Sequence, residues 1–599
     1  MRYSKLLLLL LISIQFPTFA YAFESSTLVR ETNYGWVQGT EYIDYFDGNK
    51  TESLAWIEIP YAQPPIGNLR WNAPRPPIPW DNLRLATKFG SYEKTRDSDE
   101  HACVQYAGML STADTSKYGT KDKKPQLLGS EDCLYLNIWR PKTTVENTLE
   151  KKLAVYVWIH GGANSTGKSG SPIYRGGNFS AKTNVIFISI NYRLGAFGFF
   201  TNPALRENKT GIDASGNYGI LDIIQALKWI KGNISHFGGD PNNITIAGES
   251  SGGLNIYGLL VSDLATGLFH KAIIQSGGPL TNAQQDLDKK TDQLIMDLKV
   301  AEQSNQNRSR LSIWWEIKHE SPENIIQYLR SKSADEILSK FNSDLTQSTS
   351  QMGMFYIDGV VLKNKPTYLL KQGEYNQVPI ITGNTRDEIK FFPTPLLIDS
   401  EKSYVDKLLN FTPETPNYKL SDFLIPGTLP VWNAMGLASG YGFQYVGVDN
   451  PLTIIENNNS QPFDNYAYRF DWDEAPEPMD KFTGAGHMLD IPFALGNFHT
   501  NCNTSEANCY ERKGNCVDPL DNCDVNSAEW VDGNRDIMSY LWSEANRTKR
   551  IALSEKMMSY WSNFAKTGNP NGKDINHNPL PPWPTWSQDH QRMILDSDI

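Results

Sequence analysis

Ser250 stands in the sequence Gly248-Glu-Ser-Ser-Gly252, and these residue types at this spacing could do nucleophilic chemistry. The apolar run Ile244–Ala247 before it predicts a strand, and an apolar helix is predicted from about Gly253. A sharp strand-to-helix turn needs glycines, because a β-carbon there would collide with neighbouring backbone. Such a turn projects the serine hydroxyl above the sheet, beside free N–H groups at the helix start. The pattern predicts that Ser250 is a nucleophile.

A serine nucleophile also needs N–H donors for the negative oxygen of its intermediate. The backbone N–H of Ser251, the next residue, is the first donor expected. The segment His160-Gly-Gly-Ala163 follows another apolar run, and Gly162 and Ala163 are the further donors expected from it. That segment would also suit a simple tight exit from a strand. Its occurrence together with the Ser250 turn favours an oxyanion hole.

A general base and an acid should follow the serine in the order serine, acid, histidine. Six histidines lie beyond Ser250, so their number alone does not select the base. His487 is favoured because it ends the loop Gly484-Ala-Gly-His487, which leads into an apolar run from Ile491. This arrangement combines a flexible approach with a rigid support.

Two neighbouring carboxylates are candidates for the acid. Asp387 and Glu388 follow the predicted strand Val378–Ile381 after a short turn. Either one could orient the imidazole of His487 and stabilise its protonated form. Spacing does not choose between them.

The elements that must position these residues alternate between strands and helices from about residue 150. Continuous apolar runs predict buried strands at 154–159, 185–190 and 272–274. Between them, apolar residues recur at helical spacing, namely Ile220, Ile223, Ile224, Leu227 and Ile230. Apolar strands separated by helices predict an α/β fold with a mostly parallel central sheet and helices on both faces. Ligands then bind beyond the carboxyl ends of the strands, where the candidate residues lie.

The N-terminus predicts export. Arg2 and Lys5 precede the apolar stretch Leu6–Ile14, and Ala20-Tyr-Ala22 is a small-x-small cleavage site. That stretch is shorter than the roughly 20 residues that a membrane span needs, and no other segment predicts a span or anchor. We therefore expect a signal peptide at 1–22 and a single domain at 23–599, secreted or, in a bacterium, periplasmic. The formal net charge of -11 argues against a nucleic-acid partner.

Six cysteines suit an oxidising destination. Four of them lie seven residues apart in a polar stretch at about 500–525, namely Cys502, Cys509, Cys516 and Cys523. Two local disulfides are expected there rather than a metal site, because the cluster has neither a CxxC pair nor a histidine. Sequons for N-glycosylation occur at several asparagines, among them Asn49, Asn178, Asn208, Asn307, Asn410, Asn458 and Asn546.

The chain resembles the type-B carboxylesterases, the group that includes the cholinesterases, over essentially the whole mature length. Four blocks carry the resemblance: Ser130–Trp139, Phe237–Gly253, Asn191–Gly198 and Ile59–Pro65. The resemblance implies an α/β-hydrolase fold and a serine carboxylic-ester hydrolase that acts on small-molecule esters without a cofactor. It also implies that Glu388 is the acid, that His487 is the base, and that Cys103 pairs with Cys133.

This chain departs from the family's pattern at several positions. Ala163 stands where the family has a third oxyanion glycine, Ser251 where it has an alanine, and Ile389 where a glycine is usual after the acid. Backbone N–H groups remain at 163 and 251, so an oxyanion hole is still expected. The loop 104–132 contains no tryptophan to bind a choline cation, which argues against cholinesterase activity.

Two other functions fit the same fold. Some proteins of this family are non-catalytic adhesion or binding proteins, but these commonly lack the serine, whereas serine, acid and histidine all stand here. A lipase or amidase would use the same three groups, and pocket volume would decide between these substrates. The sequence makes no prediction of the oligomeric state.

Overall fold

A computed structural model describes the chain at residues 28–90, 101–106, 127–142, 152–302, 308–341, 355–391, 397, 419–458, 463–498 and 541–598. The predicted signal peptide and the four cysteines at 502–523 lie outside these residues.

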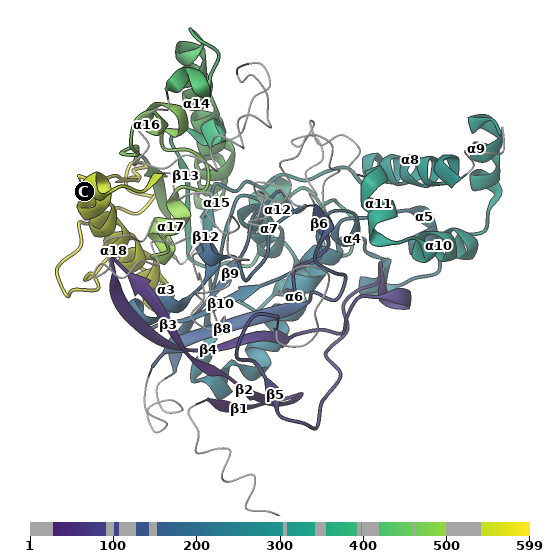
Figure 1. The fold of residues 1–599 in the computed structure, drawn as a ribbon, viewed down its shortest axis with the longest axis horizontal. Coiled ribbons are helices and arrows are strands. Elements are labelled where there is room, and N and C mark those ends of the chain that lie inside the picture. Colours follow the sequence, from purple (N-terminus) through teal and green to yellow (C-terminus); the bar gives the residue numbers. More distant parts are fainter. Residues whose placement is uncertain are drawn as a thin grey trace, which may run out of the picture.

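A central sheet of ten strands crosses the molecule (Figure 1). Its strands, in spatial order, are β15 (Met593–Leu595), β14 (Tyr466–Phe470), β13 (Ile380–Thr385), β12 (Lys271–Gln275), β11 (Gly239–Glu249), β9 (Leu153–Ile159), β10 (Ile186–Ile190), β8 (Tyr135–Pro141), β4 (Asn49–Pro60) and β3 (Thr40–Phe46). From β15 to β10 all neighbours are parallel, whereas β8, β4 and β3 continue the sheet in antiparallel pairs. The prediction of a mostly parallel sheet is confirmed.

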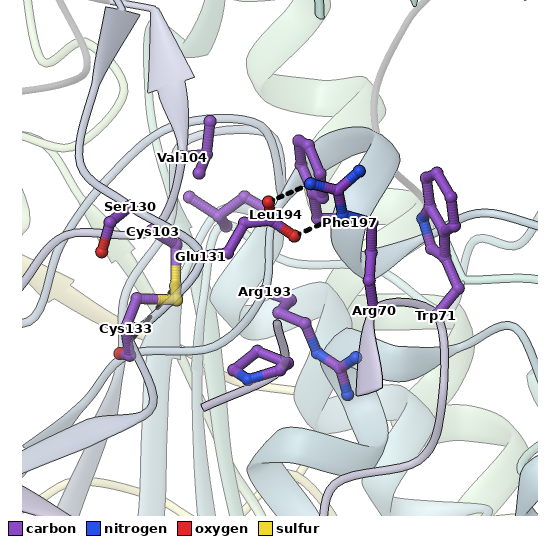
Figure 2. Close-up of a pocket in the computed structure, with 11 residues that line it drawn as sticks. Arg70, Trp71, Cys103, Val104, Ser130, Glu131, Cys133, Arg193, Leu194 and Phe197 are labelled. Carbon is purple, nitrogen blue, oxygen red and sulfur yellow. Dashed lines mark hydrogen bonds and ion pairs between the residues drawn. A yellow bond between two sulfur atoms is a disulfide. The ribbon is translucent and has the colours of Figure 1, made fainter. Parts of the chain in front are cut away.

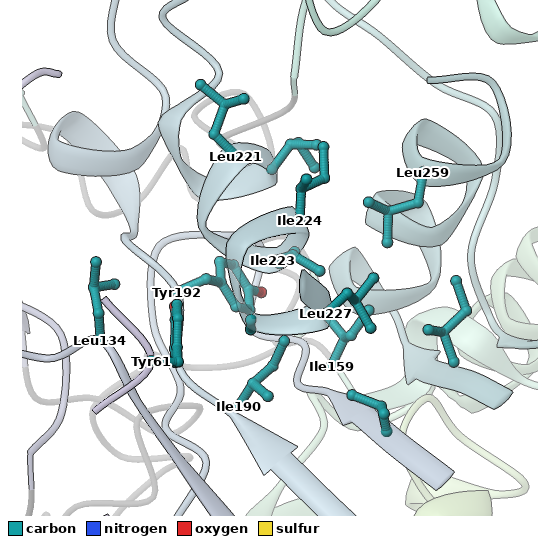
Figure 3. Packing of buried hydrophobic residues seen from close by; sticks show 14 of the residues in the cluster. Tyr61, Leu134, Ile159, Ile190, Tyr192, Leu221, Ile223, Ile224, Leu227 and Leu259 are labelled. Carbon is teal, nitrogen blue, oxygen red and sulfur yellow. The ribbon is translucent and has the colours of Figure 1, made fainter. Parts of the chain in front are cut away.

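Both faces of the sheet are covered because successive side chains of a strand point to opposite faces. In β9, Val155, Val157 and Ile159 join one buried cluster, whereas Tyr156 and Trp158 join another. The first cluster includes α6 (Tyr218–Asn233) and α7 (Ser251–Leu260), and Figure 3 shows side chains of both helices against it. The second cluster includes residues of α3 (Gly177–Thr183), α17 (Asp490–Leu495) and α18 (Glu544–Thr567). The expectation of helices on both faces is confirmed.

The predicted elements recur within a few residues. Strands β9, β10, β11, β12 and β13 and helices α6 and α7 stand where apolar runs and helical spacing placed them. The antiparallel strands β3 and β4 were not predicted, and β4 interrupts its own register between Trp56 and Ile59. Two small sheets lie beside the main one, formed by β1 (Val29–Thr32), β2 (Gly35–Gln38) and β5 (Arg84–Leu85), and by β6 (Gln105–Tyr106) and β7 (Leu127–Leu128).

Further helices lie around the sheet (Figure 1). One group lies to the right in the figure, where α8 (Gln284–Glu302), α9 (Arg310–His319), α10 (Pro322–Ser331) and α11 (Ala334–Phe341) lie together. The others are α4 (Gly195–Gly198), α5 (Pro203–Arg206), α12 (Pro366–Gln372), α14 (Leu429–Gln444), α15 (Asn450–Asn457) and α16 (Met479–Thr483). Among the described residues, none of the helices has the length and apolar character needed to cross a bilayer.

Candidate active site

Ser250 lies at the turn between β11 and α7, at the carboxyl end of the strand. Its backbone has φ 57° and ψ -123°, a conformation that non-glycine residues rarely adopt. The Ser250 N–H donates to the Gln275 carbonyl oxygen at 2.8 Å, which holds the turn against β12. A β-carbon on Gly252 would lie 2.1 Å from the Ile159 carbonyl oxygen, and one on Gly248 would lie 2.6 Å from the same atom. The glycines therefore permit the close contact with β9 that supports this strained turn.

The segment His160–Ala163 leaves the end of β9 and passes directly beside the serine. A β-carbon on Gly161 would lie 3.1 Å from Cβ of Ser250, so the two backbones approach closely. Gly162 and Ala163 follow and are half-buried, while Ser251 is buried in the first turn of α7. The three residues predicted as N–H donors thus lie on the two segments that adjoin Ser250.

His487 lies in the loop between α16 and α17, and each nitrogen of its ring faces a carboxylate. The Glu388 carboxylate forms a short hydrogen bond with Nδ1 of the ring. On the opposite side, Nε2 lies 3.0 Å from Oε1 of Glu249, the residue immediately before Ser250. The His487 side chain therefore spans from the Glu388 carboxylate to the turn that carries Ser250.

Asp387 and Glu388 are neighbours in sequence, but their side chains contact different parts of the site. Glu388 begins the 3-10 helix η9 (Glu388–Phe391) and faces the ring of His487. The Asp387 carboxylate instead binds Arg386 at 2.8 Å and Lys390 at 3.3 Å. It also accepts the Ala485 N–H at 3.1 Å. Asp387 thus fastens the backbone of the loop that carries His487, and Glu388 contacts the imidazole itself.

Sequence reasoning missed two buried residues of this site. Ser276 follows β12 directly, and its hydroxyl donates to Oε1 of Glu388 at 2.7 Å, beside the Thr385 N–H at 2.8 Å. Glu249 lies inside the motif that identified Ser250, yet no role was predicted for it. The rule that chemistry collects at the carboxyl ends of parallel strands would have pointed to both residues.

Burial and charge act in opposite directions on the titration of these groups. Burial raises the pKa of the Glu249 carboxyl above its ordinary value, because a charged carboxylate is costly to remove from water. Burial alone would lower the pKa of His487, but the carboxylates of Glu249 and Glu388 outweigh it and raise that pKa above the ordinary 6.5. The site therefore stabilises a protonated imidazole.

A disulfide joins Cys103 to Cys133, with their Cα atoms 4.9 Å apart. It borders a small pocket whose lining includes Arg70, Glu131 and Phe197 (Figure 2). An ion pair between Arg70 and Glu131 crosses this pocket, with Nε of Arg70 2.7 Å from Oε2 of Glu131. None of the residues predicted to be catalytic lines the pocket.

No group of three or more histidine, cysteine, aspartate or glutamate side chains that could hold a metal ion occurs in the part of the chain that the structure describes.

Ile389 belongs to the 3-10 helix η9 and does not have a positive φ, so the backbone at this position accepts a β-carbon without strain.

Comparison with known proteins gives consistent matches along the chain. The model of the carboxylesterase family matches residues 26–422. The para-nitrobenzyl esterase of Bacillus subtilis is 30% identical over 570 residues, which cover 95% of this chain and 94% of that protein. Carboxylesterase 5A of Canis lupus familiaris is 31% identical over 586 residues, which cover 95% of this chain and 86% of that protein.

Solved structures agree with these matches. A para-nitrobenzyl (PNB) esterase superposes with a TM-score of 0.63 at 26% identity, covering 96% of each chain. A carboxylesterase of Geobacillus stearothermophilus superposes with a TM-score of 0.62 at 28% identity, covering 95% of this chain and 96% of the other. The fold described above is therefore that of enzymes with the α/β-hydrolase architecture.

Proposed function

The chain belongs to the carboxylesterase family and is a carboxylic ester hydrolase, and from this premise we propose that it acts through an acyl-enzyme on Ser250. His487 is the general base, Glu388 is the acid that orients it, and the N–H groups of Gly162, Ala163 and Ser251 form the oxyanion hole. The observation that carries the proposal is the His487 ring, which extends from the Glu388 carboxylate to the turn of Ser250.

The cycle begins when His487 takes the Ser250 proton while the serine oxygen attacks the ester carbonyl. The negative oxygen of the tetrahedral intermediate accepts hydrogen bonds from the three N–H groups, and Glu388 stabilises the imidazolium. His487 then protonates the departing alcohol as the carbon–oxygen bond breaks. Water, deprotonated by His487, then attacks the acyl carbon. The bond from this carbon to the serine oxygen breaks, His487 returns the proton to that oxygen, and the carboxylic acid leaves.

Replacement of the nucleophile tests this proposal. We expect Ser250→Ala to lower kcat for p-nitrophenyl butyrate by about 10⁴-fold or more. Wild-type protein should gain one diethylphosphoryl group on Ser250 when treated with diethyl p-nitrophenyl phosphate, as mass spectrometry of peptides would show. Ser339→Ala, which removes an exposed hydroxyl on α11, is the matched control and should keep both turnover and labelling. Normal turnover by Ser250→Ala, or labelling elsewhere alone, would contradict the proposal.

The substrate class is a small carboxylic ester, in line with the para-nitrobenzyl esterase to which the chain is similar. A panel of p-nitrophenyl esters of graded acyl length, with an anilide and a triglyceride emulsion, distinguishes an esterase from an amidase or lipase. A non-catalytic adhesion protein would give no p-nitrophenol with any of these substrates.

Export is part of the same proposal. Cleavage after Ala22 would leave a single domain, residues 23–599, outside the cytoplasm. The support is the charged, apolar and small-residue pattern of the first 22 residues. N-terminal sequencing of protein from the medium or periplasm should begin at Phe23, and an intact N-terminus on cell-retained protein would count against export.

A further inference from the structure

The loop after His160 contains three consecutive residues with left-handed backbone. The φ values are +101° at Gly162, +56° at Ala163 and +52° at Asn164. Glycine adopts this region freely and asparagine tolerates it, but alanine is disfavoured because its β-carbon crowds the following carbonyl. Ala163 therefore holds a strained conformation at one of the positions whose N–H we assign to the oxyanion hole.

A side chain from the nucleophile helix contacts the loop directly after that alanine. The hydroxyl oxygen of Ser251 accepts the backbone N–H of Asn164 at 3.0 Å, and both residues are buried. The N–H in this bond belongs to the peptide group that joins Ala163 to Asn164. The hydrogen bond therefore fixes the orientation of a peptide group that lies between two residues with left-handed φ. An alanine at 251 could not make it.

The side chain and the carbonyl oxygen of Asn164 also form hydrogen bonds with buried groups. Its side-chain amide exchanges two hydrogen bonds with the amide of Asn255, at 3.0 and 2.8 Å. Asn255 lies one turn after Ser251 on α7, so the two residues share one face of that helix. The Tyr192 hydroxyl donates to the side-chain oxygen of Asn164 at 3.0 Å, and Gly195 N–H donates to its carbonyl at 2.7 Å.

We propose that the Ser251 hydroxyl is a positioning group, which holds the oxyanion loop in the left-handed conformation that Ala163 by itself resists. The unfavourable backbone conformation of Ala163 and the hydrogen bond from Asn164 to the Ser251 hydroxyl then compensate each other. This inference rests on the proposed function, because the loop matters only if its N–H groups bind the oxyanion. In this proposal the backbone N–H of Ser251 donates to the substrate oxyanion. The hydroxyl of the same residue does not contact the substrate but holds the segment of Ala163 and Asn164 in place.

Four proteins test this compensation: wild type, Ser251→Ala, Ala163→Gly and the double variant. We expect Ser251→Ala to lower kcat for p-nitrophenyl butyrate about 10-fold with KM changed less than about twofold, because donors displaced from the oxyanion mainly weaken the transition state. The inhibition constant of an alkyl trifluoromethyl ketone, which forms a tetrahedral adduct with the serine, should rise by a similar factor. In the Ala163→Gly background the same change at 251 should cost less than about twofold, because glycine needs no support at that φ.

Equal losses from Ser251→Ala in both backgrounds would overturn the inference, as would a loss confined to KM. Ser180→Ala is the matched control, since it removes a buried hydroxyl on α3 that donates to the Val185 carbonyl and touches none of the proposed catalytic groups. It should lower the melting temperature while kcat and the ketone's inhibition constant stay unchanged. Failure of the proposed function would appear separately, as an unlabelled Ser250 in the wild-type protein.

Discussion

At the scale of single residues, the site gathers buried carboxyl groups around one imidazole. The carboxylates of Glu249, Glu388 and Asp490 are all buried, and each favours the protonated form of His487. Asp490 is held in place by the Tyr468 hydroxyl at 2.6 Å and the Gln275 amide at 2.9 Å. Negative charges that stabilise the imidazolium during catalysis also raise the pH up to which the ring stays protonated in the free protein. A protonated ring cannot act as a base.

This environment gives a prediction for the pH dependence of the rate. The proposed base must be neutral, and its pKa lies above 6.5, so kcat/KM should fall as the pH drops through that raised pKa. A profile of p-nitrophenyl butyrate hydrolysis between about pH 5.5 and 9.5 would show the acid limb. A limb centred at or below 6.5 would contradict the assignment.

The Glu249→Gln variant tests the cause of the raised pKa. Loss of the carboxylate 3.0 Å from Nε2 should move the acid limb to lower pH, because the protonated ring loses a stabilising charge. Asp473→Asn is the control, since this exposed carboxylate pairs with Arg386 and lies outside the proposed machinery. The acid limb of the kcat/KM profile of Asp473→Asn should coincide with that of the wild type.

A second residue-scale prediction separates the two neighbouring carboxylates. Glu388→Gln should lower kcat by about 10³–10⁴-fold, because an amide cannot stabilise the imidazolium or fix its tautomer. Asp387→Asn should reduce kcat less than about 10-fold and act mainly on stability, since this side chain contacts Arg386, Lys390 and the Ala485 N–H instead of the ring. A larger kcat loss from Asp387→Asn than from Glu388→Gln would reverse the assignment.

At the scale of elements, the disulfide is connected to the proposed oxyanion loop by one side chain. Gln105 follows Cys103 by two residues and is buried. Its Nε2 donates to the Gly167 carbonyl at 2.9 Å, and its Oε1 accepts the Gly167 N–H at 2.8 Å. Gly167 lies four residues after Ala163, so the segment closed by the disulfide also supports the loop beside Ser250.

Removal of the disulfide should therefore affect both stability and rate. The bond joins residues 30 apart, and in the chain-entropy model its loss costs about 3–4 kcal/mol of unfolding free energy. We expect the Cys103→Ser, Cys133→Ser double variant to unfold at lower urea concentration and to lose about two- to fivefold in kcat as the loop loosens. Identical urea midpoints for this variant and the wild type would contradict the stabilising role.

At the scale of the whole molecule, the fold separates the glycosylation sequons into accessible and buried sites. Asn49 is exposed at the first residue of β4, and Asn208 is exposed in a turn. Asn178 is 1% exposed, and its amide nitrogen donates to the Tyr45 and Gly496 carbonyls. Asn546 is 4% exposed, and its amide nitrogen donates to the Glu474 carbonyl at 2.8 Å. A glycan on either buried amide would displace these bonds, so such protein could not adopt this fold.

Expression through a eukaryotic secretory pathway tests this separation. We expect glycans on Asn49 and Asn208 and none on Asn178 or Asn546 in active protein. Glycosidase release in heavy-oxygen water, followed by peptide mass spectrometry, marks each asparagine that carried a glycan. A marked Asn178 in enzyme of full activity would contradict the packing around α3.

The sequence by itself determined the central elements of this protein. Strands such as β9 and β10 are buried on both faces and therefore read as unbroken apolar runs, and the glycines around Ser250 mark a turn that tolerates few other residues. The antiparallel strands β3 and β4 escaped prediction because much of their pattern mixes polar, charged and apolar residues. They pair with each other as a hairpin, but β4 joins the main sheet only through β8, which lies about 80 residues further along the chain.

Only the tertiary structure decided which groups meet. Residue spacing left Asp387 and Glu388 equivalent, because two adjacent side chains differ in direction and not in position along the chain. Their directions depend on β13, η9 and the distant loop of His487, which come together only when the sheet is assembled. The contacts of Glu249, Ser276 and the Ser251 hydroxyl arise in the same way, from segments that the chain brings together at one edge of the sheet.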